Sequence, residues 1–241
     1  IIGEVLESTD GLGVFVRPDS PIAQATGYNP SYPNVLGSPE TVKGITMLLP
    51  IGTAQHFTAL KWLEKLGLGI TDVNIVNMDT AQAYQALQAK QCDAVSLNVP
   101  TFFDAENDGM VQVGNLADLG TRYVDMVVAN RKAVEGQPEL VQKYIDCITE
   151  ACAALNADPD MAADLFVEYL KEAGAETTRE NCVSDLSRVN FIEQKDWKER
   201  SLGNFAKELG EFYINLGQLE PELIDKFETN IDSEFVDTYK K

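Results

Sequence analysis

The most constraining feature of this sequence is a regular alternation of strand and helix patterns between residues 45 and 98. Short apolar runs predict buried strands, and the segments between them carry apolar residues at helical spacing. Strand–helix–strand–helix–strand at this spacing indicates right-handed crossovers and a parallel sheet. The predicted elements are the strand Ile45–Leu49, the helix Thr53–Leu66, the strand Val73–Asn77, the helix Thr80–Lys90 and the strand Asp93–Asn98.

The flanking segments carry different patterns. Residues 1–17 contain two apolar runs separated by Ser8–Gly11, which predicts a hairpin or a strand–turn–strand unit. Residues 18–44 are rich in proline and glycine and predict an extended connector. Residues 123–130 predict a further strand, and after Gly136 the pattern is helical almost to the end. The predicted helical segments there are 138–156, 159–173, 178–188, 196–216, 221–228 and 232–240.

The charge balance excludes one class of partner. Lys and Arg number 19 against 38 Asp and Glu, so the formal net charge is −19. A chain this acidic is poorly suited to neutralising phosphates, and it has no basic stripe, so we expect no nucleic-acid partner. Hydrophobic residues at 44% exclude wholesale disorder, and 241 residues suit one large α/β domain or two lobes.

The start of the chain reads as part of a strand. Ile1–Leu6 is preceded by neither a Met nor a basic region of the kind that opens a signal peptide. No apolar run approaches the roughly 18 residues of a membrane span. We therefore expect a mature or trimmed product from which any signal segment has been removed.

Residue types that would support catalysis or metal binding are sparse. The sequence has one histidine, His56, and none of the common nucleophile, phosphate-loop or metalloprotease motifs. A histidine-rich or thiolate metal site cannot be built from this set, so we expect no metal, no cofactor and no enzymatic activity. The four cysteines are too scattered for a disulfide framework, and we interpret them as small buried hydrophobic residues. They are Cys92, Cys147, Cys152 and Cys182.

The predicted strands end in polar or turn-forming tips. In an open parallel sheet, ligands bind beyond the carboxyl ends of the strands. The three tips are Pro50–His56, Met78–Thr80 and Asn98–Pro100. Because they follow neighbouring parallel strands, we expect them to converge on one edge of the sheet, and we place the functional site there.

The first tip has the features of an anion site. Gly52 permits a close backbone turn, Thr53 can cap the following helix, and the amides from Ala54 onward lack partners at the helix N-terminus. Gln55 and His56 add side-chain donors. The alternatives are that Gly-Thr merely starts a helix and that His56 is a packed or solvated residue of the first turn.

Other candidate site residues each have two interpretations. Asp79 either caps the second helix or binds a ligand amine. Asn98 is a polar end on an otherwise apolar strand, and Pro100 either stops that strand or forms a rigid rim. Arg122 forms either a hinge salt bridge or an anion contact.

Several segments, in this order and spacing, resemble a known family. They are Val42–Thr46, Gly52–His56, Leu63–Leu68, Asp72–Val76, Ala86–Ala89, Cys92–Ala94, Pro138–Val141 and Ile231–Val236. Together they are similar to the ABC-transporter solute-binding proteins of the nitrate/taurine/sulfonate type. The resemblance implies an α/β, two-lobed periplasmic-binding-protein-like fold of type II, with parallel-type sheets flanked by helices.

The resemblance also implies a function and a lobe organisation. We expect a small anionic or zwitterionic solute, such as a sulfonate, taurine or nitrate, in the inter-lobe cleft. The segments that would bind it are Gly52–His56 and Leu97–Pro100, and the second of these contains Asn98 and Val99. Residues 43–121 would form lobe II, and residues 1–42 with 122–241 would form lobe I without its N-terminal part. ABC permease subunits would be the protein partners.

The same resemblance implies an extracytoplasmic location. The protein would lie in the periplasm or be lipid-anchored at the cell surface, and it would be membrane-associated only through the transporter or that anchor. Two alternative functions stay open. One is a thiamine-pyrimidine-precursor binding protein or synthase-like enzyme, and the other is a cytosolic effector-binding regulatory domain.

Overall fold

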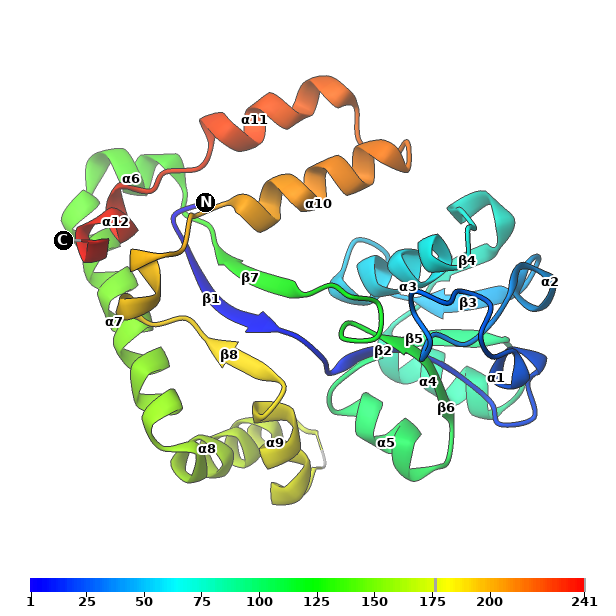
Figure 1. Ribbon diagram of the computed structural model, residues 1–241. Coiled ribbons are helices and arrows are strands. Elements are labelled where there is room, and N and C mark those ends of the chain that lie inside the picture. Colours follow the sequence, from blue (N-terminus) through cyan, green and yellow to red (C-terminus); the bar gives the residue numbers. More distant parts are fainter. Residues whose placement is uncertain (176, 241) are drawn as a thin grey trace. The chain divides into compact units, whose positions relative to one another are not determined.

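The computed structural model describes residues 1–175 and 177–240 (Figure 1). The chain forms two compact units, each assembled from segments that are separate in the sequence. Unit 1 consists of Ile1–Glu7, Tyr123–Phe166 and the chain from Val189 onward. Unit 2 consists of Ser8–Arg122 and Val167–Arg188.

Unit 2 contains a five-stranded sheet in the order β4-β3-β5-β2-β6. Strand β3 is parallel to both β4 and β5, as predicted. Strand β2 is antiparallel to both β5 and β6, so the sheet is mixed: the parallel sheet predicted for β3, β4 and β5 is confirmed, and β2 and β6 extend it. The strands are β2 (Leu12–Val16), β3 (Thr46–Leu49), β4 (Asn74–Asn77), β5 (Ala94–Asn98) and β6 (Val111–Asn115).

The helices of unit 2 follow the predicted alternation. Helix α3 (Ala54–Lys65) and helix α4 (Thr80–Gln88) lie close to their predicted bounds. Gly67 ends α3 in the left-handed region at φ +69°, a conformation that costs glycine little. Helix α5 (Thr101–Asn107) and strand β6 were not predicted. Buried side chains of β2, β5, α4 and α5 form one core, including Phe15, Leu87, Val95 and Phe102.

The N-terminal segment is placed differently from the sequence prediction. The two apolar runs form β1 (Gly3–Ser8) and β2, which join different sheets and therefore make no hairpin. Residues 8–42 belong to unit 2, whereas the prediction assigned 1–42 to the lobe of 122–241. The physical reason is the pairing of β2 between β5 and β6. The predicted connector contains two short helices, α1 (Pro21–Gln24) and α2 (Pro39–Val42).

Unit 1 is a three-stranded sheet, β7-β1-β8, accompanied by helices. Helix α7 buries Val141, Ile145 and Cys152 along one stripe, which explains its apolar spacing. The predicted strand and most predicted helices of this region are confirmed, whereas β8 and α6 were not predicted. The elements are β7 (Tyr123–Val127), α6 (Arg131–Gly136), α7 (Pro138–Ala157), β8 (Val189–Phe191), α10 (Asn204–Asn215), α11 (Ile224–Thr229) and α12 (Glu234–Asp237). Helix α8 (Pro159–Glu172) belongs to unit 1 up to Phe166 and to unit 2 from Val167.

The remaining predicted helical segments are modified in detail. Residues 178–188 form α9 (Arg179–Leu186), which belongs to unit 2. The segment predicted as 196–216 is a 3₁₀ turn (Gln194–Lys198) followed by α10. Three cysteines are buried as expected, but Cys147 is exposed. Across residues 1–175 and 177–240, no helix combines the length and apolar character that crossing a membrane requires.

Candidate functional site

The tip between β3 and α3 is shaped by Gly52. Its φ of +82° lies in the left-handed region, and a Cβ added there would meet nothing within 4 Å. The turn therefore favours glycine for its backbone conformation, and the space beside it is open. Thr53 occupies the N-cap position, but its hydroxyl donates to the Pro50 carbonyl oxygen at 2.7 Å. The side-chain cap predicted for Thr53 is thus replaced by a bond that tightens the turn.

His56 stabilises the same turn from the first turn of α3. The Gly52 N–H donates to its Nδ1 at 3.3 Å, so the neutral ring carries its proton on Nε2. The side chain is buried, and this burial lowers the pKa of the imidazole below its usual value. His56 is therefore neutral at pH 7 and can donate a hydrogen bond from Nε2.

A single buried amide joins the three tips. The Gln55 Nε2 donates to Asn98 Oδ1 at 2.9 Å and to Thr80 Oγ1 at 3.1 Å. The Gln55 carbonyl oxygen accepts from Ser96 Oγ at 2.8 Å. Gln55 is 7% exposed, so these bonds replace hydration that the amide loses on burial. The ends of β3, β4 and β5 therefore meet at one edge of the sheet, in agreement with the predicted topology.

The other predicted site residues occupy distinct positions. Asp79 Oδ1 accepts from the Ala81 N–H at 3.1 Å, so this carboxylate caps α4, the first of its two predicted interpretations. Leu97 is fully buried in the core, backbone included, so it is not accessible at the tip. Pro100 follows a cis Val99–Pro100 bond and precedes α5. Arg122 is half-buried at the end of the first unit 2 segment.

Three further side chains support the tips: sequence reasoning placed Thr80 at the second tip without assigning it a contact, and it missed Ser96 and Asn77. Thr80 accepts from Gln55, Ser96 donates to the Gln55 backbone, and the Asn77 Oδ1 accepts from the Ile51 N–H at 2.9 Å. Asn77 and Ser96 are polar residues within apolar strands, which was a usable signal. Ser96 is 41 positions from its partner Gln55, and Asn77 is 26 positions from its partner Ile51. No local pattern identifies pairs so far apart.

The electrostatics of the tip favour an anion. The amides at the start of α3 carry the positive end of the helix dipole. Within the described ranges, no group of three or more His, Cys, Asp or Glu side chains is arranged to hold a metal. Among the described residues, the tip therefore offers hydrogen-bond donors and no set of side chains that could bind a metal.

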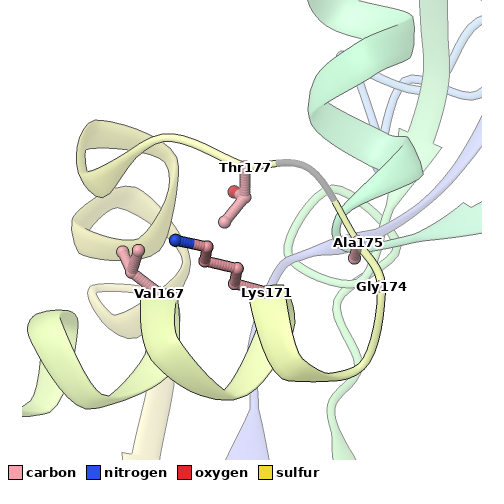
Figure 2. A pocket seen from close by; sticks show the side chains of 5 residues that line it. All are labelled: Val167, Lys171, Gly174, Ala175 and Thr177. Carbon is pink, nitrogen blue, oxygen red and sulfur yellow. The ribbon is translucent and has the colours of Figure 1, made fainter.

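A separate pocket of unit 2 involves none of the predicted site residues. It has a volume of about 520 Å³ and lies at the C-terminal end of α8, where the Lys171 side chain extends toward Thr177 (Figure 2). Its lining residues are Val167, Lys171, Gly174, Ala175 and Thr177. The pocket is therefore distinct from the tips of β3, β4 and β5.

The fold defines the class of protein. A mixed sheet flanked by helices is shared with proteins of the periplasmic-binding-protein fold, which confirms the predicted fold class. The chain belongs to the NMT1/THI5 like family, whose model matches residues 32–162. The predicted resemblance to binding proteins of ABC transporters is also confirmed by the relatives described next.

Two relatives show how much of a longer protein this chain corresponds to. A protein of Brachyspira hyodysenteriae that bears the name of an ABC transporter periplasmic binding protein is 33% identical over 236 residues, covering 98% of this chain and 68% of that protein. The taurine-binding periplasmic protein of Escherichia coli is 24% identical over 163 residues, covering 67% of this chain and 47% of that protein. The chain thus spans about half to two thirds of these relatives.

Solved structures with the same fold include both a binding protein and an enzyme. The alkanesulfonate-binding protein SsuA from Xanthomonas axonopodis, bound to MOPS, matches with a TM-score of 0.70 at 16% identity, covering 96% of this chain and 73% of that one. The desulfurization enzyme DszB matches with a TM-score of 0.65 at 17% identity, covering 99% of this chain and 78% of that one. At such identities the likeness concerns the fold alone.

Proposed function

We propose that this chain is the solute-binding component of an ABC importer and that unit 2 contributes its solute-binding tips. The solute is a small anionic or zwitterionic compound of the sulfonate, taurine or nitrate kind. Family membership and the names of the relatives support the transport role. The observation that carries the proposal is the Gln55 amide, whose hydrogen bonds hold the ends of three strands together at the N-terminus of α3.

The chemistry of the tip suits the charged group of such a solute. The first amides of a helix lack intrahelical partners and carry partial positive charge, so they bind sulfonate, nitrate or carboxylate oxygens. The open space beside Gly52 permits close approach of an anion, and His56 holds this turn by accepting a hydrogen bond from the Gly52 N–H. The net charge of −19 does not oppose this, because salt screens distant charges beyond about 8 Å at physiological ionic strength.

The proposed partners follow from the transport role. ABC permease subunits would receive the solute, and the protein would act outside the cytoplasm, in the periplasm or tethered by a lipid anchor. Binding rather than catalysis is the proposed activity, because the tip offers hydrogen-bond donors and no evident nucleophile–base pair.

Calorimetric titration tests the proposed function. We expect saturable binding of at least one member of a panel of nitrate, taurine, ethanesulfonate and a pyrimidine precursor of thiamine. Binding of the pyrimidine alone would contradict the proposal of a small anion or zwitterion. We expect His56→Ala to weaken binding about tenfold or more, since it removes the acceptor of the Gly52 N–H and loosens this turn.

Asn29→Ala is the matched control. The Asn29 amide donates to the Lys65 carbonyl oxygen at 2.7 Å, at the opposite end of α3 from the tip. This variant should bind the solute like the wild type. If His56→Ala and Asn29→Ala have the same affinity, the assignment of the tip is wrong.

A further inference from the structure

A carboxylate lies beside the loop that follows β5. Asp185 of α9 approaches the turn before β2: its Oδ1 lies 3.2 Å from the point where a Cβ of Gly11 would be. The Val99 side chain lies 3.9 Å from the same point. Backbone bonding keeps this region together, because the Thr9 N–H donates to the Arg188 carbonyl oxygen at 3.0 Å. Asp185 and the tip residue Val99 thus flank one glycine.

The charges around Asp185 are unbalanced. The Arg188 guanidinium lies over the rings of Phe102 and Phe103, 5.1 and 5.2 Å from their centroids, and its Nε is 3.8 Å from Asp10 Oδ2. Glu106 of α5 is near the same guanidinium and the same Asp10 carboxylate. Three carboxyl groups, those of Asp10, Glu106 and Asp185, therefore share one guanidinium.

The balance of burial and charge makes Asp185 easier to protonate than an ordinary aspartate. Burial is the largest effect and raises its pKa to about 6, Arg188 lowers it, and Asp10 raises it. Burial also raises the pKa of Glu106, which Arg188 lowers and Asp10 raises. With a pKa of about 6, Asp185 changes its charge within the physiological pH range.

This group of charges is connected directly to the proposed solute tip. Leu12, the residue after Gly11, pairs with Asn98 in the sheet. Phe102 and Phe103, on which Arg188 lies, belong to the first turn of α5, directly after the cis bond to Pro100. A change of charge at Asp185 therefore acts next to the loop that presents Asn98.

We propose that Asp185 is a positioning residue that makes anion binding at the unit 2 tips depend on pH, with its protonated form favouring the bound state. The proposal rests on the function proposed above. A negative carboxylate beside Val99 repels an anion at the tip. A proton on Asp185 removes this repulsion. By linkage, the anion then binds more tightly as the pH falls through the pKa of Asp185.

The test is calorimetric titration with ethanesulfonate, which stays fully ionised from pH 4.5 to 8. Cationic buffers at constant ionic strength are required, because sulfonate buffers would compete. We expect the wild type to bind about three- to tenfold more tightly at pH 5 than at pH 7.5. This is the effect expected when one unit charge near the surface, partly screened by salt, no longer repels the anion. Asp185→Asn should bind with nearly constant affinity across this range.

Two further variants separate other sources of pH dependence. His56 also titrates beside the tip, and an anion would favour its protonated form, so Asp185→Asn is compared with His56→Gln. Asp225→Asn, an exposed carboxylate on α11, controls for the loss of one negative charge and should retain the pH dependence. If Asp185→Asn keeps the wild-type pH profile, or if the profile is lost only in His56→Gln, the proposal is wrong.

The solute-free protein provides an independent measurement. Because the folded pKa of Asp185 lies above the usual value, proton binding stabilises the folded state at low pH, and this stabilisation is lost as the pH rises through about 6. Asp185→Asn should therefore raise the stability of unit 2 at pH 7.5 more than at pH 4.5. Equal effects at both pH values would overturn the role of Asp185. Absence of ethanesulfonate binding at every pH would instead overturn the function proposed above, and this inference with it.

Discussion

The two units use buried polar side chains in different ways. In unit 2, the neutral Gln55 amide joins three strand ends at an open tip. In unit 1, the buried Glu4 carboxylate accepts from Arg200 Nε at 2.6 Å, and Arg200 also donates to Glu7 at 2.8 Å. The neutral Gln55 network leaves the positive potential at the N-terminus of α3 available to an anion. In the Glu4–Arg200 pair, by contrast, the two opposite charges cancel. The comparison teaches that buried polar side chains shape the proposed binding tip in unit 2, whereas in unit 1 they stabilise the fold.

A second network supports this contrast. In unit 1 the Tyr239 hydroxyl donates to Asp146, and Gln142 Nε2 donates to the Phe235 carbonyl oxygen at 3.1 Å. Both bonds hold the C-terminal segment on α7. Burial raises the pKa of Tyr239 to about 12, so this phenol remains a donor at all physiological pH values. The C-terminal chain of unit 1 is therefore tied to α7 by hydrogen bonds from neutral donors.

The comparison can be tested unit by unit, because each unit contains one of the two tryptophans. Trp62 belongs to unit 2 and Trp197 to unit 1, and both are fully buried. Trp62→Phe leaves a fluorescence signal from unit 1 alone, and Trp197→Phe leaves one from unit 2 alone. Urea unfolding in these two backgrounds assigns each loss of stability to its unit.

The largest effect is expected for Glu4→Ala. Removing this carboxylate leaves the Arg200 guanidinium half-paired in a largely buried position, so the free energy of unfolding of unit 1 should fall by about 3–5 kcal/mol. The measurement is urea unfolding followed by Trp197 fluorescence. Glu228→Ala is the control, because its pair with Lys207 is exposed and is worth at most about 1 kcal/mol. Equal losses of unfolding free energy in the two variants would contradict the proposal that buried Glu4 stabilises unit 1.

An intermediate effect is expected for Gln55→Ala. The substitution leaves Asn98 and Thr80 without their donor, which should cost unit 2 about 1–3 kcal/mol and weaken solute binding about tenfold. Unfolding followed by Trp62 fluorescence and calorimetric titration measure the two effects, with Asn29→Ala as the control. If Gln55→Ala lowers the stability of unit 2 but leaves the affinity for the solute unchanged, the unit 2 network, like that of unit 1, only stabilises the fold.

The smallest effect on stability is expected for Gly52→Ala. The φ of +82° should cost about 1 kcal/mol, with no clash because the space beside the residue is open. Gly44→Ala is a close match, since Gly44 has a φ of +79° and is equally open. Both variants should lose similar stability, but only Gly52→Ala should weaken solute binding. Weaker binding in both would remove the special role of the β3–α3 turn.

Local patterns predicted the parts of the fold that depend on neighbouring residues. The alternation between residues 45 and 98 located β3, α3, β4, α4 and β5, because helix and strand spacing is visible within a short window. The convergence of the three tips followed from parallel topology. The cap at Asp79 was also among the predicted alternatives, because capping acts over two or three residues.

Only the tertiary structure decided which distant segments meet. Strand β2 is too short and apolar for its pattern to reveal that it pairs antiparallel between β5 and β6, so the boundary of unit 2 was misplaced. Glu4 and Arg200 are 196 positions apart, and Gln55 and Asn98 are 43. Such contacts depend on how apolar faces pack, which many sequences satisfy in the same way. The sequence by itself therefore determined the elements and their polar tips, whereas long-range packing determined their partners and placed Asp185 beside the β5 loop.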